Sequence, residues 1–364
     1  MNLLDDEMYI KDIDKVANKK FSWEIMNNKA IVISGASGMI GSFLIDVLMK
    51  KNTEGLNCTV YALGRNIEKA KKRFGKYWND KHFFFIAGDI NQGINVNRDV
   101  IEFFFHAASN THPIAYSTDP IGTITTNIIG TYNLLEYAVA HHAERFIFAS
   151  SVEVYGENRG DTDKFTEDYC GYLDCNTLRA GYPESKRAGE ALCQAFIKQK
   201  ELDIVIPRLS RTFGPTMLQS DTKAISQFIK KGVACEDIIL KSEGTQFYSY
   251  SYVADAVSGI LTCLFEGKCG EAYNIADEKC DISLKDLAAI IADYVGKKVI
   301  FELPDATEKA GYSKATKAVL DGKKLKKIGW NPEYDMKDGL IRTIDILKTA
   351  RQEDTKYTPN NLLG

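Results

Sequence analysis

Residues Lys29 to Gly41, KAIVISGASGMIG, lead from a short apolar run into a turn with three glycines. The apolar part is typical of a buried strand, and residues with helical periodicity follow the turn. Gly35, Gly38 and Gly41 allow a tight turn and a close approach of the backbone to a ligand. The free N–H groups at the start of the next helix favour a pyrophosphate at this point. The stretch therefore predicts a dinucleotide-binding β-α unit, and a turn that only packs helix on strand is the alternative.

The same alternation of strand and helix continues toward the C-terminus. Repeated β-α units favour a parallel sheet that is covered by helices on both faces. Beyond Gly214 the pattern loosens into shorter mixed elements, which we expect to lie over the carboxyl ends of the strands. The predicted fold class is α/β, a doubly wound Rossmann sheet with a smaller mixed α/β substrate-binding lobe. The expected strands are 58–63, 82–87, 101–106, 145–150, 203–209, 247–252 and 271–275, and the expected helices are 66–74, about 122–142, and 183–198.

These patterns divide the chain into four parts. Residues 1–28 form an N-terminal extension with one or two short helices, which packs against the main body or a partner subunit. Residues 29–212, joined by parts of 240–280, form the dinucleotide-binding Rossmann domain. Residues 213–350 form most of the substrate-binding lobe, and residues 351–364 form a tail.

Composition excludes several classes of function. The chain has 364 residues, 45% of them hydrophobic and 26% charged, as in ordinary globular proteins. Its net charge of -3 gives no reason to expect nucleic acid or an anionic membrane as a partner. No apolar run is long enough to span a membrane, and the first residues lack the apolar core of a signal peptide. The eight cysteines form no C-x-x-C pair, so we expect reduced thiols, no metal site and a cytoplasmic protein.

A tyrosine and a lysine stand four residues apart where a helix is expected to begin. Pro183 is predicted to be the first helical residue, because its fixed φ suits that position and its missing N–H is not needed there. Tyr182 and Lys186 would then leave the helix on the same side. An ammonium beside a phenol lowers the pKa of the phenol, which would make Tyr182 a usable proton acceptor. The alternative is an ordinary amphipathic helix with two amphipathic side chains at its surface.

The residue after the second strand reports on the type of dinucleotide. The sequence there is Gly64-Arg65-Asn66, without the acidic residue that would bind the ribose hydroxyls of NAD. Arg65 favours the 2′-phosphate of NADP, although an arginine can also stack on the adenine or lie exposed in a loop. Asp89, after the third strand, could accept a hydrogen bond from the adenine amino group or cap a helix.

Five motifs occur in order at the expected ends of the strands, and together they carry a resemblance. The chain resembles the extended short-chain dehydrogenases, the nucleotide-sugar epimerase, dehydratase and decarboxylase family. The resemblance extends from Lys29 to about Leu347. Its motifs are the glycine turn, Gly88–Ile90, His106–Ser109, Ser150–Gly156 and Tyr182-x-x-x-Lys186, followed by the closing segments 320–325 and 329–332.

The resemblance implies a redox cycle on a sugar nucleotide. A tightly bound and recycled NAD or NADP takes hydride from the sugar C4, and the 4-keto sugar can then undergo epimerisation, dehydration or decarboxylation at or next to the acidified C5. It assigns Tyr182 as the base, Lys186 as the group that lowers its pKa and binds the ribose, and Ser151 as a hydrogen-bond partner of the C4 oxygen. A hydroxyl that bonds only to backbone is the alternative for Ser151. The implied cofactor contacts are Gly35, Ser37, Gly38, Met39, Ile40, Gly41, Arg65, Asp89, Ile90, Ala107, Ala108, Ser109, Asn127, Tyr182 and Lys186.

Two neighbouring positions separate the reactions within this family. Glu153 stands where 4,6-dehydratases and hexuronate decarboxylases carry a carboxylate that plain C4-epimerases do not need. Dehydratases place an aspartate just before it to protonate the leaving hydroxyl. Val152 occupies that position here and cannot donate a proton, which disfavours dehydration.

The segment from Glu167 to Cys193 is similar to UDP-glucuronate decarboxylases, and it includes Arg179. Two positions depart from their pattern, because Tyr248 replaces an arginine and Arg211 replaces an asparagine. Arg211 could restore the lost positive charge near a diphosphate, and Lys223 stands where another basic residue is expected. Arg179, Arg211, Lys223 and Tyr248 are the candidate substrate contacts, with plain surface charge as the alternative for Arg211 and Lys223.

We therefore expect an enzyme that modifies a nucleoside-diphosphate sugar through a 4-keto intermediate, most like a UDP-glucuronate decarboxylase. A C4-epimerase and a 4,6-dehydratase are the alternatives within the class, and a catalytically silent cofactor-binding regulatory protein is the alternative outside it. By analogy the protein would be a homodimer, formed by pairing the long helices before and at Tyr182.

Overall fold

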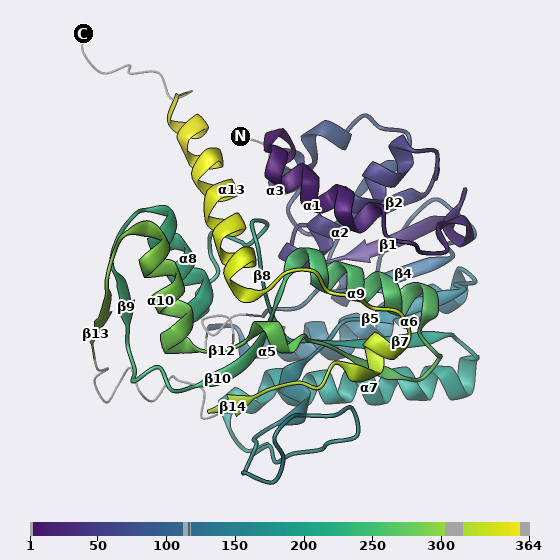
Figure 1. Cartoon of the computed structure of the whole chain (residues 1–364). Coiled ribbons are helices and arrows are strands. Elements are labelled where there is room, and N and C mark those ends of the chain that lie inside the picture. Colours follow the sequence, from purple (N-terminus) through teal and green to yellow (C-terminus); the bar gives the residue numbers. More distant parts are fainter. Residues whose placement is uncertain (1–2, 112–115, 117, 303–315, 357–364) are drawn as a thin grey trace.

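A parallel sheet forms the centre of the computed structural model, which describes residues 3–111, 116, 118–302 and 316–356. Its strand order is β11-β7-β5-β4-β1-β2-β3, and the short β6 pairs with β7 (Figure 1). Every pairing within it is parallel, as the repeated β-α units predict. The strands are β1 (Ala30–Ser34), β2 (Thr59–Gly64), β3 (Phe83–Ala87), β4 (Phe103–His106), β5 (Arg145–Phe148), β6 (Ser150–Ser151), β7 (Ile204–Leu209) and β11 (Ala272–Ile275).

Both faces of this sheet are buried under helices. Along β1 the side chains of Ala30 and Val32 join one apolar cluster and those of Ile31 and Ile33 join the other, because successive side chains of a strand point to opposite faces. The prediction of a doubly wound sheet is thereby confirmed. One face is covered by α6 (Thr131–Ala140) and α7 (Gly181–Lys200), and the other by α1 (Glu7–Ala17), α2 (Met39–Thr53), α3 (Ile67–Phe74) and α9 (Val253–Glu266).

Two of the expected helices differ in detail from the prediction. The helix expected over about 122–142 consists of α5 (Pro120–Thr125), a π-helical turn η5 (Thr126–Gly130) and α6. Helix α7 begins at Gly181 instead of Pro183, so the proline lies inside the first turn. Its missing N–H is tolerated there because the first N–H groups of a helix have no partner within the helix.

The smaller lobe is built around a mixed sheet beside the carboxyl ends of the large one (Figure 1). β10 pairs in parallel with β8 and β14 and antiparallel with β12, and a separate pair joins β9 and β13. The expected strand 271–275 instead joins the large sheet as β11. The elements are β8 (Arg211–Phe213), α8 (Ala224–Val233), β9 (Ile238–Leu240), β10 (Phe247–Tyr252), β12 (Asp281–Ser283), α10 (Leu284–Val295), β13 (Val299–Phe301), β14 (Lys317–Ala318), α12 (Lys323–Lys327) and α13 (Met336–Lys356).

The N-terminal extension packs against the main body. Its helix α1 carries Asp12, a fully buried carboxylate that accepts hydrogen bonds of 2.6 Å from the hydroxyls of Tyr252 and Tyr334. These partners lie on and beyond the small sheet, so the extension ties the lobe to the Rossmann sheet. Helix α13 continues to Lys356, so six residues of the expected tail are helical, and the remaining eight lie outside the described residues. Within the described parts, no helix is long and apolar enough to cross a membrane.

Candidate active site

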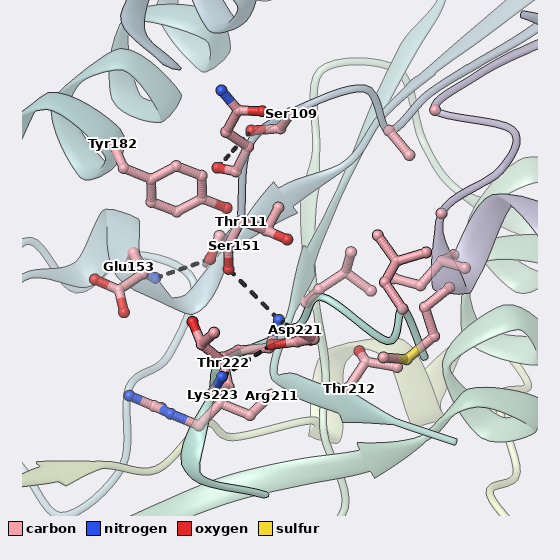
Figure 2. A pocket seen from close by; sticks show the side chains of 18 of the residues that line it. Ser109, Thr111, Ser151, Glu153, Tyr182, Arg211, Thr212, Asp221, Thr222 and Lys223 are labelled. Carbon is pink, nitrogen blue, oxygen red and sulfur yellow. Dashed lines mark hydrogen bonds and ion pairs between the residues drawn. The ribbon is translucent and has the colours of Figure 1, made fainter. Parts of the chain in front are cut away.

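A cavity of about 1090 Å³ lies between the carboxyl ends of the parallel strands and the small lobe. This is where open α/β sheets bind their ligands. Figure 2 shows Tyr182, Ser151 and Glu153 on one wall, with Arg211, Thr222 and Lys223 from the lobe side across from them.

The glycine turn forms one end of this cavity. Gly35 has a φ of +69°, and a Cβ at this position would lie 2.8 Å from the backbone of Ala107. A Cβ at Gly41 would lie 2.6 Å from the carbonyl oxygen of Gly35, so the helix could not approach the turn as closely. Gly38 precedes α2 without any side-chain cap, which leaves the first N–H groups of the helix facing the cavity. The turn therefore fits a pyrophosphate, as the sequence predicts.

Buried polar side chains support the turn after β4. Ser34 accepts hydrogen bonds of 3.2 Å from the backbone N–H groups of Ala107 and Ala108, and lies 2.7 Å from Nδ1 of His106. Burial lowers the pKa of His106 to about 3, so its ring is neutral. The predicted contact Asn127 does not line the cavity. It lies behind the wall, accepts a 2.7 Å hydrogen bond from Ser109 and donates one of 2.8 Å to a serine of α7.

The residues expected at the adenosine end lie at the cavity wall. Arg65 is exposed in the loop after β2 and faces the cavity together with Lys69 of α3. Burial lowers the pKa of Lys69. Asp89 also lines the cavity, and its carboxylate accepts a 2.9 Å hydrogen bond from the N–H of Asn91. Asp89 therefore acts as the helix cap that was one of its two predicted roles.

Tyr182 and Ser151 meet at the wall opposite the glycine turn. Burial raises the pKa of Tyr182 to about 12, and a hydrogen bond from Ser151 acts in the opposite direction. Lys186, which is predicted to lower this pKa, is not among the groups that shift it in the structure. The Lys186 ammonium donates a 2.8 Å hydrogen bond to the carbonyl oxygen of Ala149 and lies over the ring of Phe148 instead. Burial lowers the pKa of Lys186 itself to about 8.

Glu153 lies beside this pair and is already engaged by a positive charge. Its carboxylate accepts a hydrogen bond of 2.8 Å from Nη2 of Arg179, which was predicted as a substrate contact. The Arg179 guanidinium lies 4.9 Å from the centre of the Tyr116 ring, and Tyr116 in turn packs on Tyr182. Ser151 accepts a hydrogen bond of 3.3 Å from the N–H of Glu153, so its backbone role is also present.

The lobe contributes an arginine and a lysine in different environments. The guanidinium of Arg211 lies 3.6 Å from the centre of the Tyr248 ring, and one of its nitrogens is buried without a hydrogen-bond partner among the described residues. Lys223 forms a 2.7 Å ion pair with Asp221 and reaches toward the carbonyl oxygen of Thr111. Both basic residues line the cavity, so neither is plain surface charge.

The structure thus gathers the predicted residues around one cavity, with Asn127 as the exception noted above. No sequence motif identified several residues of the cavity wall, because a single tyrosine or threonine in an irregular loop has no pattern that predicts a binding role. Lys69 could have been found, since it lies in the first turn of α3, four residues after Arg65. The cavity-lining residues missed by the sequence analysis include Lys69, Thr111, Tyr116, Asp221 and Thr222.

A Rossmann sheet, a glycine turn shaped for a pyrophosphate and a Ser-Tyr-Lys set across the cavity define a dinucleotide-dependent enzyme. Residues 31–276 match the NAD dependent epimerase/dehydratase family. The chain belongs to this family.

Curated relatives within the family share about 30% of their residues with this chain. It is 30% identical over 336 residues to UDP-glucuronic acid decarboxylase 1 of Xenopus tropicalis, covering 92% of this chain and 76% of the relative. It is 31% identical over 330 residues to UDP-glucuronic acid decarboxylase 6 of Arabidopsis thaliana, covering 89% of each.

Solved structures show the same fold at lower identity. UDP-glucuronic acid 4-epimerase from Bacillus cereus, in complex with UDP-glucuronic acid and NAD, has a TM-score of 0.73 at 23% identity. That match covers 88% of this chain and 99% of the epimerase chain. dTDP-glucose 4,6-dehydratase from Bacillus anthracis in complex with NAD has a TM-score of 0.72 at 21% identity, covering 89% and 98%.

Proposed function

We propose that this enzyme oxidises C4 of a nucleoside-diphosphate hexuronate, most simply UDP-glucuronate, and releases the C6 carboxylate as CO₂. The observation that carries the proposal is the convergence of Ser151, Glu153 and Tyr182 on the cavity wall opposite the glycine turn. Similarity to UDP-glucuronic acid decarboxylases over most of the chain supports the choice of substrate.

Each side chain of the site has a separate role in the oxidation at C4. When bound, the oxidised nicotinamide supplies the hydride acceptor and a positive charge that lowers the pKa of a neighbouring phenol. Tyr182 Oη then takes the proton of the C4 hydroxyl, and Ser151 hydrogen-bonds the same oxygen. Lys186, on the same face of α7, would hold the ribose hydroxyls of the cofactor. Burial of Tyr182 excludes water from the proton transfer.

The fate of the 4-keto sugar depends on what surrounds C5 and C6. Loss of CO₂ breaks the C5–C6 bond, sends its electron pair toward the C4 carbonyl oxygen and needs a proton at C5. Return of the hydride to C4, with a proton from Tyr182 to the C4 oxygen, then gives the UDP-pentose and restores the oxidised cofactor. Glu153, paired with Arg179, is the carboxylate nearest to Tyr182 on this wall. Val152, which is 6% exposed, offers no proton to a leaving C6 hydroxyl. The geometry therefore favours decarboxylation over dehydration.

Incubation with UDP-glucuronate and mass analysis of the products tests the proposal. The expected product is a UDP-pentose, lighter by CO₂. An isomeric product would identify a C4-epimerase, and loss of water from a UDP- or dTDP-hexose would identify a 4,6-dehydratase. If no sugar nucleotide reduces the bound cofactor, the protein is a catalytically silent member of the family.

For the substrate diphosphate we propose Arg211 as the main contact. Its planar guanidinium is held against the Tyr248 ring, which leaves its edge free for phosphate oxygens. Lys223 is held by Asp221 at the lobe edge of the cavity and supplies a second positive charge. Arg179 faces the sugar end beside Glu153.

We propose that the cofactor site prefers NADP, because Arg65 and Lys69 both face the cavity and the loop after β2 holds no acid. Arg65→Asp should reverse the preference, lowering NADP affinity relative to NAD by about 10- to 100-fold, the worth of one charge-assisted hydrogen bond. Titration calorimetry with both cofactors measures the ratio. Lys72→Asp, which makes the same charge change outside the cavity, should leave the ratio unaltered. Equal ratios in all three proteins would contradict the preference.

We propose that the protein is a homodimer formed by pairing α7 and the helices before it, α5, η5 and α6. Apolar side chains on α5, η5 and α6 are exposed there, including Ile121 at 76%, Ile129 at 46% and Tyr132 at 47%. A contiguous exposed apolar face of this kind marks a protein interface. Ile129→Glu should convert a dimer to a monomer in sedimentation velocity, whereas Ile300→Glu on β13 should not. A monomeric wild type would contradict the proposal.

The two sheets suggest which parts of the chain bind the cofactor and which bind the substrate. We assign residues 29–212 with parts of 240–280 to cofactor binding, because β11 joins the large sheet, and residues 213–350 mostly to substrate binding.

All eight cysteines are free thiols, which supports a reducing compartment such as the cytoplasm.

A further inference from the structure

Helix α7 carries a partly buried carboxylate in line with its two functional residues. Glu190 follows Lys186 by four residues and Tyr182 by eight, so the three side chains lie along one face of the helix. The Glu190 side chain is 15% exposed and faces the sheet. The groups that bind the Glu190 carboxylate therefore fix the positions of Tyr182 and Lys186 relative to the cavity.

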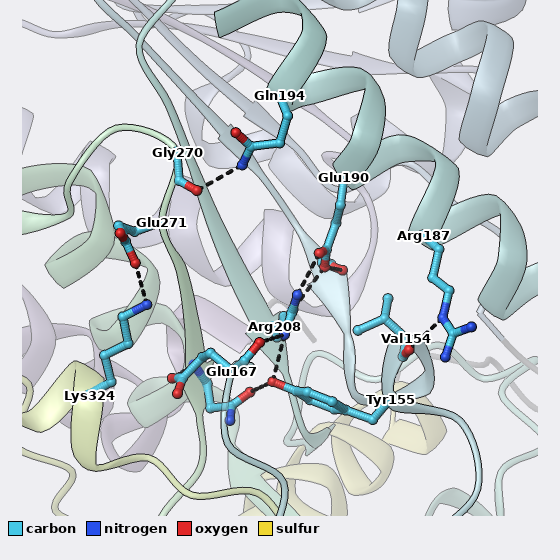
Figure 3. A network of polar contacts seen from close by, with 12 residues as sticks. Val154, Tyr155, Glu167, Arg187, Glu190, Gln194, Arg208, Gly270, Glu271 and Lys324 are labelled. Atoms are coloured by element: carbon cyan, nitrogen blue, oxygen red, sulfur yellow. Dashed lines mark hydrogen bonds and ion pairs between the residues drawn. The ribbon is translucent and has the colours of Figure 1, made fainter. Parts of the chain in front are cut away.

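Glu190 is bound from two adjacent strands. Its Oε1 accepts hydrogen bonds from Ser150 Oγ at 2.5 Å and from Arg208 Nε at 3.0 Å, and its Oε2 accepts one from Arg208 Nη2 at 2.7 Å. Ser150 and Arg208 are direct partners in the β6–β7 ladder, so their side chains point to the same face. Figure 3 shows the carboxylate of Glu190 and the Arg208 fork meeting edge to edge.

The other end of the Arg208 guanidinium holds a second point of the chain. Nη1 donates to the hydroxyl of Tyr155 at 3.0 Å and to the carbonyl oxygen of Glu167 at 2.7 Å. The Tyr155 hydroxyl in turn donates to Asn274 of β11 at 2.6 Å. Tyr155 closes the 3-10 turn η6 (Val152–Tyr155), which Ser151 caps. The Glu190–Arg208 ion pair therefore binds residues 150–155 at both ends, through Ser150 and Tyr155, and we call these residues the clasped segment.

We propose that the Glu190–Arg208 pair is a positioning device that aligns Ser151 and Glu153, on the clasped segment, with Tyr182 and Lys186 on α7. This inference rests on the proposed oxidation at C4. The pair does not touch the cavity and has no part in its wall. The pair acts through the residues that it binds. Segment 150–155 and α7 cannot shift relative to one another while both are bound to the same Glu190–Arg208 pair.

The Glu190–Arg208 pair also influences the pKa of Lys186. The titratable groups that face Lys186 are Glu190 and Cys193 of α7 and His106 of β4, which is neutral. Burial lowers the pKa of Lys186 to about 8, and the negative charge of Glu190 opposes this. Removing that charge should lower the pKa of Lys186 further. A reaction that needs the ammonium would then lose rate at a lower pH than in the wild type.

Glu190→Gln tests the inference by steady-state and single-turnover reduction of the bound cofactor with UDP-glucuronate. The maximal rate should fall by about 10- to 100-fold, as expected for misplaced catalytic groups, while KM stays within about three-fold. The basic limb of the pH profile should move to lower pH. Gln194→Leu is the matched control, since it removes another hydrogen bond of α7, to the carbonyl oxygen of Gly270 at 2.8 Å, without touching the clasped segment. It should retain the wild-type rate and pH profile.

Because Glu190→Gln leaves Arg208 without its partner, a second variant separates alignment from folding. Glu190→Leu with Arg208→Met replaces the pair by apolar side chains of similar volume, an exchange that proteins often tolerate. It should melt near the wild-type temperature and be as slow as Glu190→Gln. A wild-type rate in this double variant, or an unmoved basic limb in Glu190→Gln, would overturn the inference.

A structural readout distinguishes a failure of the inference from a failure of the proposed function. If wild-type protein reduces no cofactor with any sugar nucleotide, the proposed function fails. Crystal structures of the wild type and the double variant then decide the inference alone. Displacement of Ser151 relative to Tyr182 supports it, and an unmoved Ser151 overturns it.

Discussion

Tyr182→Phe should slow reduction of the bound cofactor by UDP-glucuronate by about 10³-fold, within the range that a positioned acid-base group contributes. The phenylalanine ring keeps the packing on Tyr116 and the burial of the site but cannot accept the C4 hydroxyl proton. Substrate and cofactor affinity should change by less than about three-fold, since the lost interaction matters only in the transition state.

Single-turnover absorbance of the reduced nicotinamide measures this loss, and calorimetry with UDP-glucuronate measures the affinity. Tyr294→Phe is the matched control, because this tyrosine bonds Asp345 at the surface of α10, away from the cavity. It should react at the wild-type rate. A Tyr182→Phe enzyme within ten-fold of the wild type would show that another group takes the proton.

Gly35→Ala should weaken cofactor binding by at least about 100-fold and destabilise the fold by about 2–4 kcal/mol. A positive φ costs a non-glycine residue about 1–2 kcal/mol, and the added Cβ would stand 2.8 Å from the backbone of Ala107. The turn after β4 must move to relieve this contact. Because that turn lines the cavity beside the pyrophosphate cradle, the ligand site is distorted along with the backbone.

Gly296→Ala separates the backbone strain from the close approach. Gly296 ends α10 with a φ of +67°, close to the +69° of Gly35, and a Cβ there would meet nothing within 4 Å. It should cost only the strain, about 1–2 kcal/mol in urea unfolding, and leave the affinity for NAD and NADP unchanged in calorimetry. If Gly35→Ala and Gly296→Ala behaved alike in both measurements, the glycine turn would not be the cofactor cradle.

Local patterns predicted the framework of the protein well, because they reflect interactions between near neighbours. The run from Ala30 to Ile33 is apolar at every position, which a strand in a sheet buried on both faces requires. Gly35 has the positive φ that its place in the turn predicts. Tyr182 and Lys186 are on the same helix face because helical geometry alone sets that relation.

Relations between side chains from distant segments were beyond the reach of the sequence. The spacing of Tyr182 and Lys186 predicted a lowered phenol pKa, but burial raises it to about 12 and Lys186 bonds Ala149. Burial is a property of the assembled core, so no spacing can report it. Likewise, nothing in the sequence showed that Glu153 would be paired with Arg179, 26 residues further on.

The sequence by itself therefore determined the doubly wound parallel sheet, the glycine turn and the side chains that converge on the cavity. Only the tertiary structure decided how those side chains act on one another. It pairs Glu153 with Arg179, stacks Arg211 on Tyr248, and clasps the segment of Ser151 to α7 through Glu190 and Arg208. The reason is physical, since hydrogen bonds and ion pairs act over a few ångströms, and the fold alone decides which distant residues come that close.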